Sequence, residues 1–181
     1  EAVTNKLQES GSKIMIKGNS ITIKGKEIKG VDIQTAPFPG FPTDLQAPFT
    51  TLMAIANGES KITEIIFENR MNHVHLLNKM GANIKLNKNT AYIKGVKSLK
   101  GMDLVGSDLR SSAALIIAGI VAKGTSKIYG LEHLDRGYEN FESKLKILGI
   151  KITREFHKKT LKNEECKSNS DISDISQYRA A

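Results

Sequence analysis

Two kinds of hydrophobic pattern alternate along most of this chain. Short runs in which apolar and polar residues alternate predict strands, as at residues 13–17 and 20–24, which flank the hairpin turn signal Gly18-Asn19. Longer runs with apolar residues three or four positions apart predict helices, and several of these runs stop at a glycine, as helices often do. The pattern therefore predicts an α/β domain of alternating helices and strands.

The expected elements cover most of the first 154 residues. Helices are predicted at residues 1–10, 45–57, 70–80, 109–123 and 137–148. Strands are predicted at residues 13–17, 20–24, 62–67, 84–86, 91–94, 126–131 and 150–154. Residues 155–181 are polar and have no apolar face, so we expect one domain over residues 1–154 and a disordered or weakly structured tail over residues 155–181.

A sequence unit recurs along the domain. Gly58-Glu59-Ser60-Lys61-Ile62-Thr63 returns as Gly124-Thr125-Ser126-Lys127-Ile128-Tyr129, 66 residues later. Arg70 and Arg136 follow at the same separation. The repeat predicts a domain built by duplication of a compact α/β unit. Arginines that keep their place in two copies are candidates for one shared anionic site.

The two copies differ in one loop. Asp32 and Asp44 are 12 positions apart, whereas Asp103 and Asp108 are five apart. The additional residues belong to Thr35-Ala36-Pro37-Phe38-Pro39-Gly40-Phe41-Pro42, which contains three of the four prolines of the chain. This density of proline predicts an extended, fixed loop rather than a helix or a central strand. Its presence in one copy indicates a local function.

Composition narrows the class of protein. The chain has 181 residues, 39% of them hydrophobic, and a single cysteine, Cys166, so an internal disulfide is excluded. The longest apolar run, residues 112–122, is too short to span a membrane, and no segment resembles a signal peptide. A reducing, cytoplasmic location and no contact with a membrane are expected.

The net charge of +8 favours a partner that carries phosphate, such as a nucleic acid or a nucleotide-linked metabolite. The lysines are scattered, aromatic residues make up 6% of the chain, and no stacking platform or recognition helix is visible, so no nucleic acid is expected. His73 and His75 are two positions apart and face different sides of a helix. Neither a metal site nor a cofactor is expected.

Five charged residues are candidates for chemistry. Asp44 and Asp108 each stand at the start of a predicted helix, where a carboxylate commonly caps the free amides. Asp44 follows the proline-rich loop and is also a candidate general base. Arg70, Arg110 and Arg136 lie near predicted helix starts, where a cation opposes the helix dipole. They are either solvated surface residues or ligands for phosphate or carboxylate.

Four segments, in order, resemble one family. Thr35-Ala36-Pro37-Phe38-Pro39-Gly40-Phe41-Pro42-Thr43-Asp44-Leu45-Gln46 is similar to the signature loop of the UDP-N-acetylglucosamine 1-carboxyvinyltransferase family of enolpyruvyl transferases. Phe67-Glu68-Asn69-Arg70, Gly106-Ser107-Asp108-Leu109-Arg110 and Leu134-Asp135-Arg136-Gly137-Tyr138-Glu139 resemble further motifs of that family. The resemblance implies transfer of enolpyruvate from phosphoenolpyruvate to the 3-hydroxyl of UDP-N-acetylglucosamine. It also implies that phosphate is released and that the reaction is the first committed step of peptidoglycan synthesis.

The resemblance also implies a fold and a site. The family has two domains of repeated α/β units, an inside-out α/β barrel, with the active site in the cleft between them. By motif, Asp44 is the carboxylate that contacts the sugar hydroxyl and is proposed as its base, and Ile66 contacts substrate through its backbone. Arg136 corresponds to an arginine that binds phosphoenolpyruvate. Further cleft residues are Arg70, Asp108 and Arg110.

The chain resembles only the C-terminal part of such an enzyme. The resemblance implies that the domain with a Lys-Asn pair and a reactive cysteine lies outside this part, and Cys166 does not match that cysteine. The missing N-terminal half is therefore an expected partner, and we expect the chain alone to be inactive. Two alternatives remain open from the residues: a transferase acting on shikimate phosphate, and a non-catalytic α/β domain that binds nucleotides or RNA with its basic face.

Overall fold

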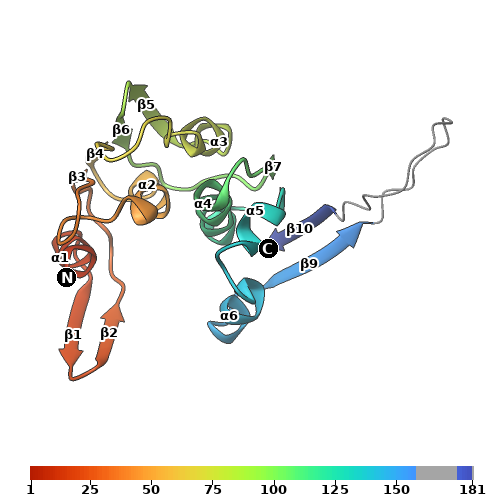
Figure 1. The fold of residues 1–181 in the computed structure, drawn as a ribbon, viewed down its shortest axis with the longest axis horizontal. Coiled ribbons are helices and arrows are strands. Elements are labelled where there is room, and N and C mark those ends of the chain that lie inside the picture. Colours follow the sequence, from red (N-terminus) through yellow and green to blue (C-terminus); the bar gives the residue numbers. More distant parts are fainter. Residues whose placement is uncertain (158–174, 181) are drawn as a thin grey trace, which may run out of the picture.

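The computed structural model of this chain describes residues 1–157 and 175–180. It contains three sheets with helices between them (Figure 1). The helices are α1 (Ala2–Glu9), α2 (Gln46–Ala54), α3 (His73–Lys79), α4 (Leu109–Val121), α5 (Glu132–Asp135) and α6 (Phe141–Ile147), with a 3-10 turn η1 (Thr43–Leu45) before α2. The strands are β1 (Lys13–Lys17), β2 (Ser20–Lys24), β3 (Ile33–Gln34), β4 (Glu59–Thr63), β5 (Asn83–Asn87), β6 (Thr90–Lys94), β7 (Asp103–Val105), β8 (Ser126–Tyr129), β9 (Ile152–His157) and β10 (Ile175–Ala180).

Two of the sheets have the same topology, which confirms the predicted duplication. Their strand orders are β3-β4-β6-β5 and β7-β8-β10-β9. In each, the first two strands are parallel and the remaining pairs are antiparallel. Equivalent backbone bonds close both units: the amide of Thr35 donates to the carbonyl of Thr63 at 3.0 Å, and that of Gly106 donates to Tyr129 at 2.9 Å.

The predicted hairpin of β1 and β2 is confirmed, with its turn at Gly18-Asn19. Its register repeats that of β5 and β6, since Lys13 faces Lys24 as Asn83 faces Lys94. Within the described residues, however, this hairpin forms a two-stranded sheet without the two further strands that complete the others. Its apolar side chains are consequently exposed, including Met15, Ile16, Ile21 and Ile23.

The expectation that the chain is unstructured from residue 155 onward does not hold at the two ends of this segment. Residues 155–157 belong to β9, and β10 lies between β8 and β9, in the place that β6 takes in the other sheet. A strand between two neighbours is held by backbone hydrogen bonds on both edges, which side-chain patterns do not reveal. Residues 158–174 and 181 of the expected tail lie outside the described part of the chain.

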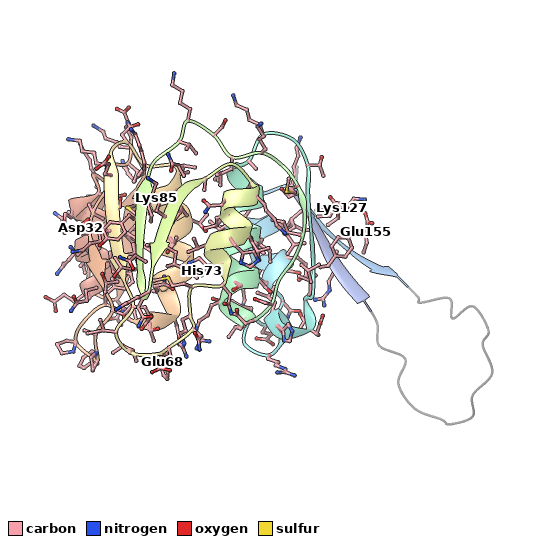
Figure 2. All side chains as sticks on the ribbon, turned by 90° about the horizontal axis from the view of Figure 1, so that it is seen from above. Asp32, Glu68, His73, Lys85, Lys127 and Glu155 are labelled. Atoms are coloured by element: carbon pink, nitrogen blue, oxygen red, sulfur yellow. The ribbon has the colours of Figure 1, made fainter. Side chains whose placement is uncertain are left out.

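The core lies between the two four-stranded sheets. Figure 2 shows the helices in the middle, with Lys85 of β5 and Lys127 of β8 on opposite outer sides. Helix α2 packs against α4, where the hydroxyl of Thr51 donates to the carbonyl of Ala114 at 3.2 Å. Small buried residues in α4 permit this close approach. They are Ser111, Ser112, Ala113, Ala114, Ala118 and Gly119.

The helices at three predicted positions are shorter than the sequence pattern indicated. The helix expected from residue 70 begins at His73, the one expected from residue 137 begins at Phe141, and the one expected to reach residue 57 ends at Ala54. Apolar spacing continues into the flanking loops because these also cover the core, so it overestimates helix length. No helix in the described ranges is long and apolar enough to cross a membrane.

Candidate active site

The proline-rich loop is neither a helix nor a central strand, as its sequence predicted, and it is closed at its base although Pro37, Phe38 and Pro39 are exposed. The amide of Ala36 donates to the carbonyl of Phe41 at 3.0 Å, and that of Gly40 donates to Pro37 at 2.8 Å. Phe41 is buried and its ring meets that of Phe49 edge to face, with centroids 5.3 Å apart. The loop therefore fixes the position of η1, and with it that of Asp44.

Asp44 is held by two arginines through one oxygen. Its Oδ1 accepts hydrogen bonds from Nε of Arg110 at 2.6 Å and from a terminal nitrogen of Arg70 at 3.2 Å. The second oxygen, Oδ2, has no hydrogen-bond partner among the described residues, and the side chain is 68% exposed. The carboxylate is thus oriented from one side and open to a ligand from the other.

The N-cap interpretation of Asp44 is wrong, whereas that of Asp108 is confirmed. Leu45 is the N-cap of α2 and Pro42 that of η1, and neither position has a side-chain cap bond. The reason is the ion pair, which draws the Asp44 carboxylate away from the amides of α2 toward Arg110. At the start of α4, Oδ1 of Asp108 accepts hydrogen bonds from the backbone amides of Arg110 and Ser111, both at 3.0 Å.

Asp108 fixes the helix turn from which Arg110 projects. The hydroxyl of Ser111 adds a hydrogen bond of 2.6 Å to its second oxygen. Burial by itself raises the pKa of Asp108, but the hydrogen bonds from Ser111, Arg110 and Ser107 outweigh burial and hold the pKa below its ordinary value. Asp108 is therefore an ionised cap that orients Arg110 through the backbone.

Arg70 lies between the proline-rich loop and the segment that follows β4. Its guanidinium covers the ring of Phe67 at 3.7 Å from the centroid and donates to Oγ1 of Thr43 at 3.1 Å. These contacts, together with its hydrogen bond to Asp44, place Arg70 at the site although it lies 26 positions after Asp44 in the sequence. Arg70 precedes α3 rather than starting it.

Arg136 is placed differently from the prediction. It follows α5 as its C-cap, where the helix dipole favours a cation, instead of standing at a helix start. Arg136 is exposed, and its guanidinium forms no hydrogen bond or ion pair with the side chains and backbone that the structure describes. The adjacent Gly137 lies against Leu109, so close that an added Cβ would be 3.1 Å from that side chain. Arg136 therefore lies beside the first turn of α4, which carries Arg110.

Ile66 enters the site through its backbone. Its amide donates to Oε1 of Glu64 at 2.8 Å, while its carbonyl accepts no hydrogen bond from the described residues.

Glu64 was not singled out from the sequence, although it is 1% exposed and accepts four hydrogen bonds. One sequence signal could have found it: the repeat aligns Glu64 with Gly130, so the carboxylate occurs in one copy.

Tyr138 belongs to one of the family-like motifs but was not itself a candidate site residue from the sequence. It precedes α6, and its ring packs against Phe141 with centroids 4.9 Å apart. Burial and the negative charge of Asp44 raise the pKa of the Tyr138 hydroxyl, while Arg110 opposes them. This interaction places Tyr138 within electrostatic range of the Asp44 ion pair.

A pocket of about 340 Å³ adjoins Arg70 and Phe67. His75, Lys88 and Glu64 also contribute to its lining. Among the described residues, no group of three or more His, Cys, Asp or Glu side chains is placed to hold a metal ion. What the site offers is a carboxylate with one oxygen held by two arginines and the other open, an arrangement suited to a ligand that carries a hydroxyl group.

Comparison with known proteins identifies the class. A sequence model of the EPSP synthase (3-phosphoshikimate 1-carboxyvinyltransferase) family matches residues 1–145, and the chain therefore belongs to this family of carboxyvinyl, or enolpyruvyl, transferases. Two relatives from Prochlorococcus marinus, strains MIT 9312 and MIT 9301, are 81% and 86% identical over 181 residues. Both are named UDP-N-acetylglucosamine 1-carboxyvinyltransferase, and the match covers 100% of this chain and 40% of each relative.

Solved structures agree with the predicted fold class. The enolpyruvyl transferase NikO from Streptomyces tendae is similar with a TM-score of 0.73 at 25% identity, covering 82% of this chain and 35% of that chain. EPSP synthase from Acinetobacter baumannii has a TM-score of 0.64 at 17% identity, covering 97% of this chain and 38% of the other, a likeness of fold. The chain thus has the α/β fold of part of an enolpyruvyl transferase.

Proposed function

We propose that this chain forms one side of the active site of an enzyme that transfers enolpyruvate from phosphoenolpyruvate to the 3-hydroxyl of UDP-N-acetylglucosamine, with release of phosphate. The observation that carries the proposal is the Asp44 carboxylate. One of its oxygens is fixed by Arg70 and Arg110, and the other is open to solvent. A carboxylate held in this way can accept a hydrogen bond, and then a proton, from a sugar hydroxyl.

The other residues divide the remaining tasks. Arg136 has its guanidinium free of partners in the described residues and is assigned to phosphoenolpyruvate, whose phosphate and carboxylate match the planar fork. The open carbonyl of Ile66 is assigned to the sugar nucleotide. Arg70 and Arg110 orient Asp44, and Asp108 orients Arg110. The cations also stabilise negative charge that develops as the phosphate leaves.

The site needs the rest of the protein to be complete. The chain spans about 40% of the length of the curated relatives it matches. The unpaired edge of the β1–β2 hairpin and its exposed apolar side chains are suited to cover by another segment of the same protein. We propose that the missing N-terminal half supplies this cover and the opposite wall of the cleft. The activity would then serve peptidoglycan synthesis in the cytoplasm, and the isolated chain would be inactive.

A hybrid enzyme tests the proposal. In it, this chain replaces the 181 matched residues of the relative from Prochlorococcus marinus strain MIT 9301. We expect phosphate release that requires both phosphoenolpyruvate and UDP-N-acetylglucosamine, and none from the relative with those residues deleted. A folded hybrid that releases no phosphate would contradict the proposal.

One alternative substrate has specific support, because the matching family model is described by 3-phosphoshikimate. The same hybrid distinguishes the two acceptors. Phosphate release with shikimate 3-phosphate but not with the UDP-sugar would favour the alternative. The names of the 81% and 86% identical relatives support the UDP-sugar.

A further inference from the structure

Glu64 joins the two ends of the proline-rich loop. It follows β4 and is 1% exposed. Thr35, the first residue of the loop, donates from its hydroxyl to Oε1 of Glu64 at 2.8 Å. Thr43, directly after the loop, donates to Oε2 at 2.7 Å. A single buried carboxylate therefore closes the loop at both ends.

The same carboxylate also holds the segment that leads to Arg70. The amides of Ile66 and Phe67 donate to Oε1 at 2.8 Å and 3.2 Å. Phe67 in turn carries the guanidinium of Arg70 on its ring. Backbone and ring contacts thus place Arg70 relative to Glu64.

A chain of hydrogen bonds connects Glu64 with Asp44. The hydroxyl of Thr43 donates to Glu64 and accepts from Arg70 at 3.1 Å. The same nitrogen of Arg70 donates to Asp44 at 3.2 Å. Displacing Glu64 would therefore disturb Asp44 through Thr43 and Arg70, without direct contact between the two carboxylates.

The second repeat shows that the fold itself does not require this carboxylate. Gly130 occupies the position equivalent to Glu64, and Gly106 that equivalent to Thr35. The two glycines approach so closely that a Cβ on Gly130 would lie 2.6 Å from the carbonyl oxygen of Gly106. The same strand arrangement therefore forms with no side chains at these two positions. Glu64 occurs in the copy that has the proline-rich loop.

We propose that Glu64 is a positioning residue for enolpyruvyl transfer, which holds the proline-rich loop, the backbone of Ile66 and, through Thr43 and Arg70, the carboxylate of Asp44. The proposal rests on the proposed function. All four groups that surround the carboxylate act as donors to it, so an ionised acceptor fits there. Burial raises the pKa of Glu64, but these hydrogen bonds outweigh burial and keep the pKa below its ordinary value.

Variants of the hybrid enzyme test this role. Glu64→Gln keeps the size and one acceptor oxygen but presents an NH₂ group to one of the donors, and Glu64→Ala leaves all four donors unpaired. We expect kcat to fall about tenfold in Glu64→Gln and about a hundredfold in Glu64→Ala, because small displacements of reacting groups cost that much. The KM for phosphoenolpyruvate should stay within about twofold, since Arg136 lies outside this network. Glu59→Gln, on the exposed face of β4, is the matched control and should behave as the parent.

Thr43 provides the conservative rescue. Thr43→Val removes the hydroxyl and should lower kcat by about as much as Glu64→Gln, and the two changes together should cost little more than either one. Thr43→Ser keeps the hydroxyl and should restore most of the activity. A role confined to stability would leave the kcat of the folded variants unchanged, and that result would overturn the proposal.

Amide hydrogen exchange supplies a readout that does not depend on turnover. In Glu64→Gln and Glu64→Ala, exchange should accelerate at least about tenfold over residues 36–44 and 65–67 and remain unchanged in α4. Exchange that matches the parent in these segments would overturn the positioning role. If the parent hybrid is folded but releases no phosphate, the proposed function fails, while the exchange result still decides whether Glu64 holds the loop.

Discussion

Nε of Arg110 donates a 2.6 Å hydrogen bond to Oδ1 of Asp44, although the two residues are 66 positions apart. Asp44 belongs to the first repeat and Arg110 to α4 of the second, so the two repeats meet at one carboxylate oxygen. This contact orients the Asp44 carboxylate from the side of the second repeat.

The role of Asp44 predicts a large loss of turnover when its charge is removed. Asp44→Asn in the hybrid enzyme keeps the shape but removes the base, and kcat should fall by about 10² to 10⁴. Phosphate release measures the effect. Asp103→Asn, an exposed aspartate of β7, is the control and should retain parental activity. A kcat for Asp44→Asn within about threefold of the parent would contradict the assignment.

The geometry of Arg110 predicts that a positive charge alone at this position is insufficient for full activity. Arg110→Lys keeps the cation but loses the planar pair of donors that meets Oδ1 of Asp44. We expect kcat to fall about tenfold or more, with the melting temperature within about 2 °C of the parent, because Asp108 caps α4 through backbone amides. Full activity in Arg110→Lys would show that the contact of two guanidinium nitrogens with Oδ1 is dispensable.

Much of the fold was predictable because its signals are local. The Gly18-Asn19 turn fixed the register of β1 and β2, and the 66-residue repeat predicted the duplicated sheets. The position of β10 was not predictable, since it depends on pairing with β8 and β9 across distant parts of the chain. Likewise, the apolar spacing that continues past the helix ends concealed the C-cap position of Arg136.

The site was predictable where residue type and place already suggest chemistry. Asp44 and Arg110 were both candidates, but their direct contact joins two repeats and no local pattern encodes it. The ion pair also explains why Asp44 is not the expected N-cap. Glu64 has no motif of its own, and its importance arises from partners up to 29 positions away. Comparing the copies position by position reveals it as a difference from Gly130.

The cap at Asp108 predicts that removing its side-chain acceptor destabilises the protein. Asp108→Ala should lower the free energy of unfolding by about 1–2 kcal/mol, because two amides at the start of α4 lose their acceptor. Asp108→Ser, which can still accept these bonds, should retain most of the stability. Urea denaturation of the hybrid enzyme measures both. Equal stability of Asp108→Ala and the parent would mean that the cap contributes nothing.

Buried His73 predicts a pH dependence of stability. Burial is the main cause that lowers the pKa of His73 from 6.5 to about 4, with His75 adding to it and Asp108 opposing it. The folded pKa lies below the unfolded one, so this stability is fully present above pH 6.5 and is lost as the pH falls toward 4. The slope is about 1.4 kcal/mol per pH unit within that window. Glu64 and Asp108 also have lowered pKa values, but they lose their contributions only below their unfolded values of 4.5 and 3.8.

Urea denaturation at pH 7, 6 and 5 isolates the contribution of His73. His73→Leu should be less sensitive to pH over this range than the parent. His75→Leu, on the exposed side of α3, removes only the smaller contribution of His75 to the His73 pKa and should change the slope less than His73→Leu does. Identical slopes for His73→Leu and the parent would contradict a neutral, buried His73.

Complementation in trans tests the central claim most directly. This chain would be mixed with the separately prepared remainder of the relative from strain MIT 9301, and phosphate release would be followed with phosphoenolpyruvate and UDP-N-acetylglucosamine present. We predict that the mixture is active and that neither part is active by itself. The activity should be lost when the chain carries Asp44→Ala. Turnover by the isolated chain, or no turnover by a mixture shown to be folded and associated, would contradict the account.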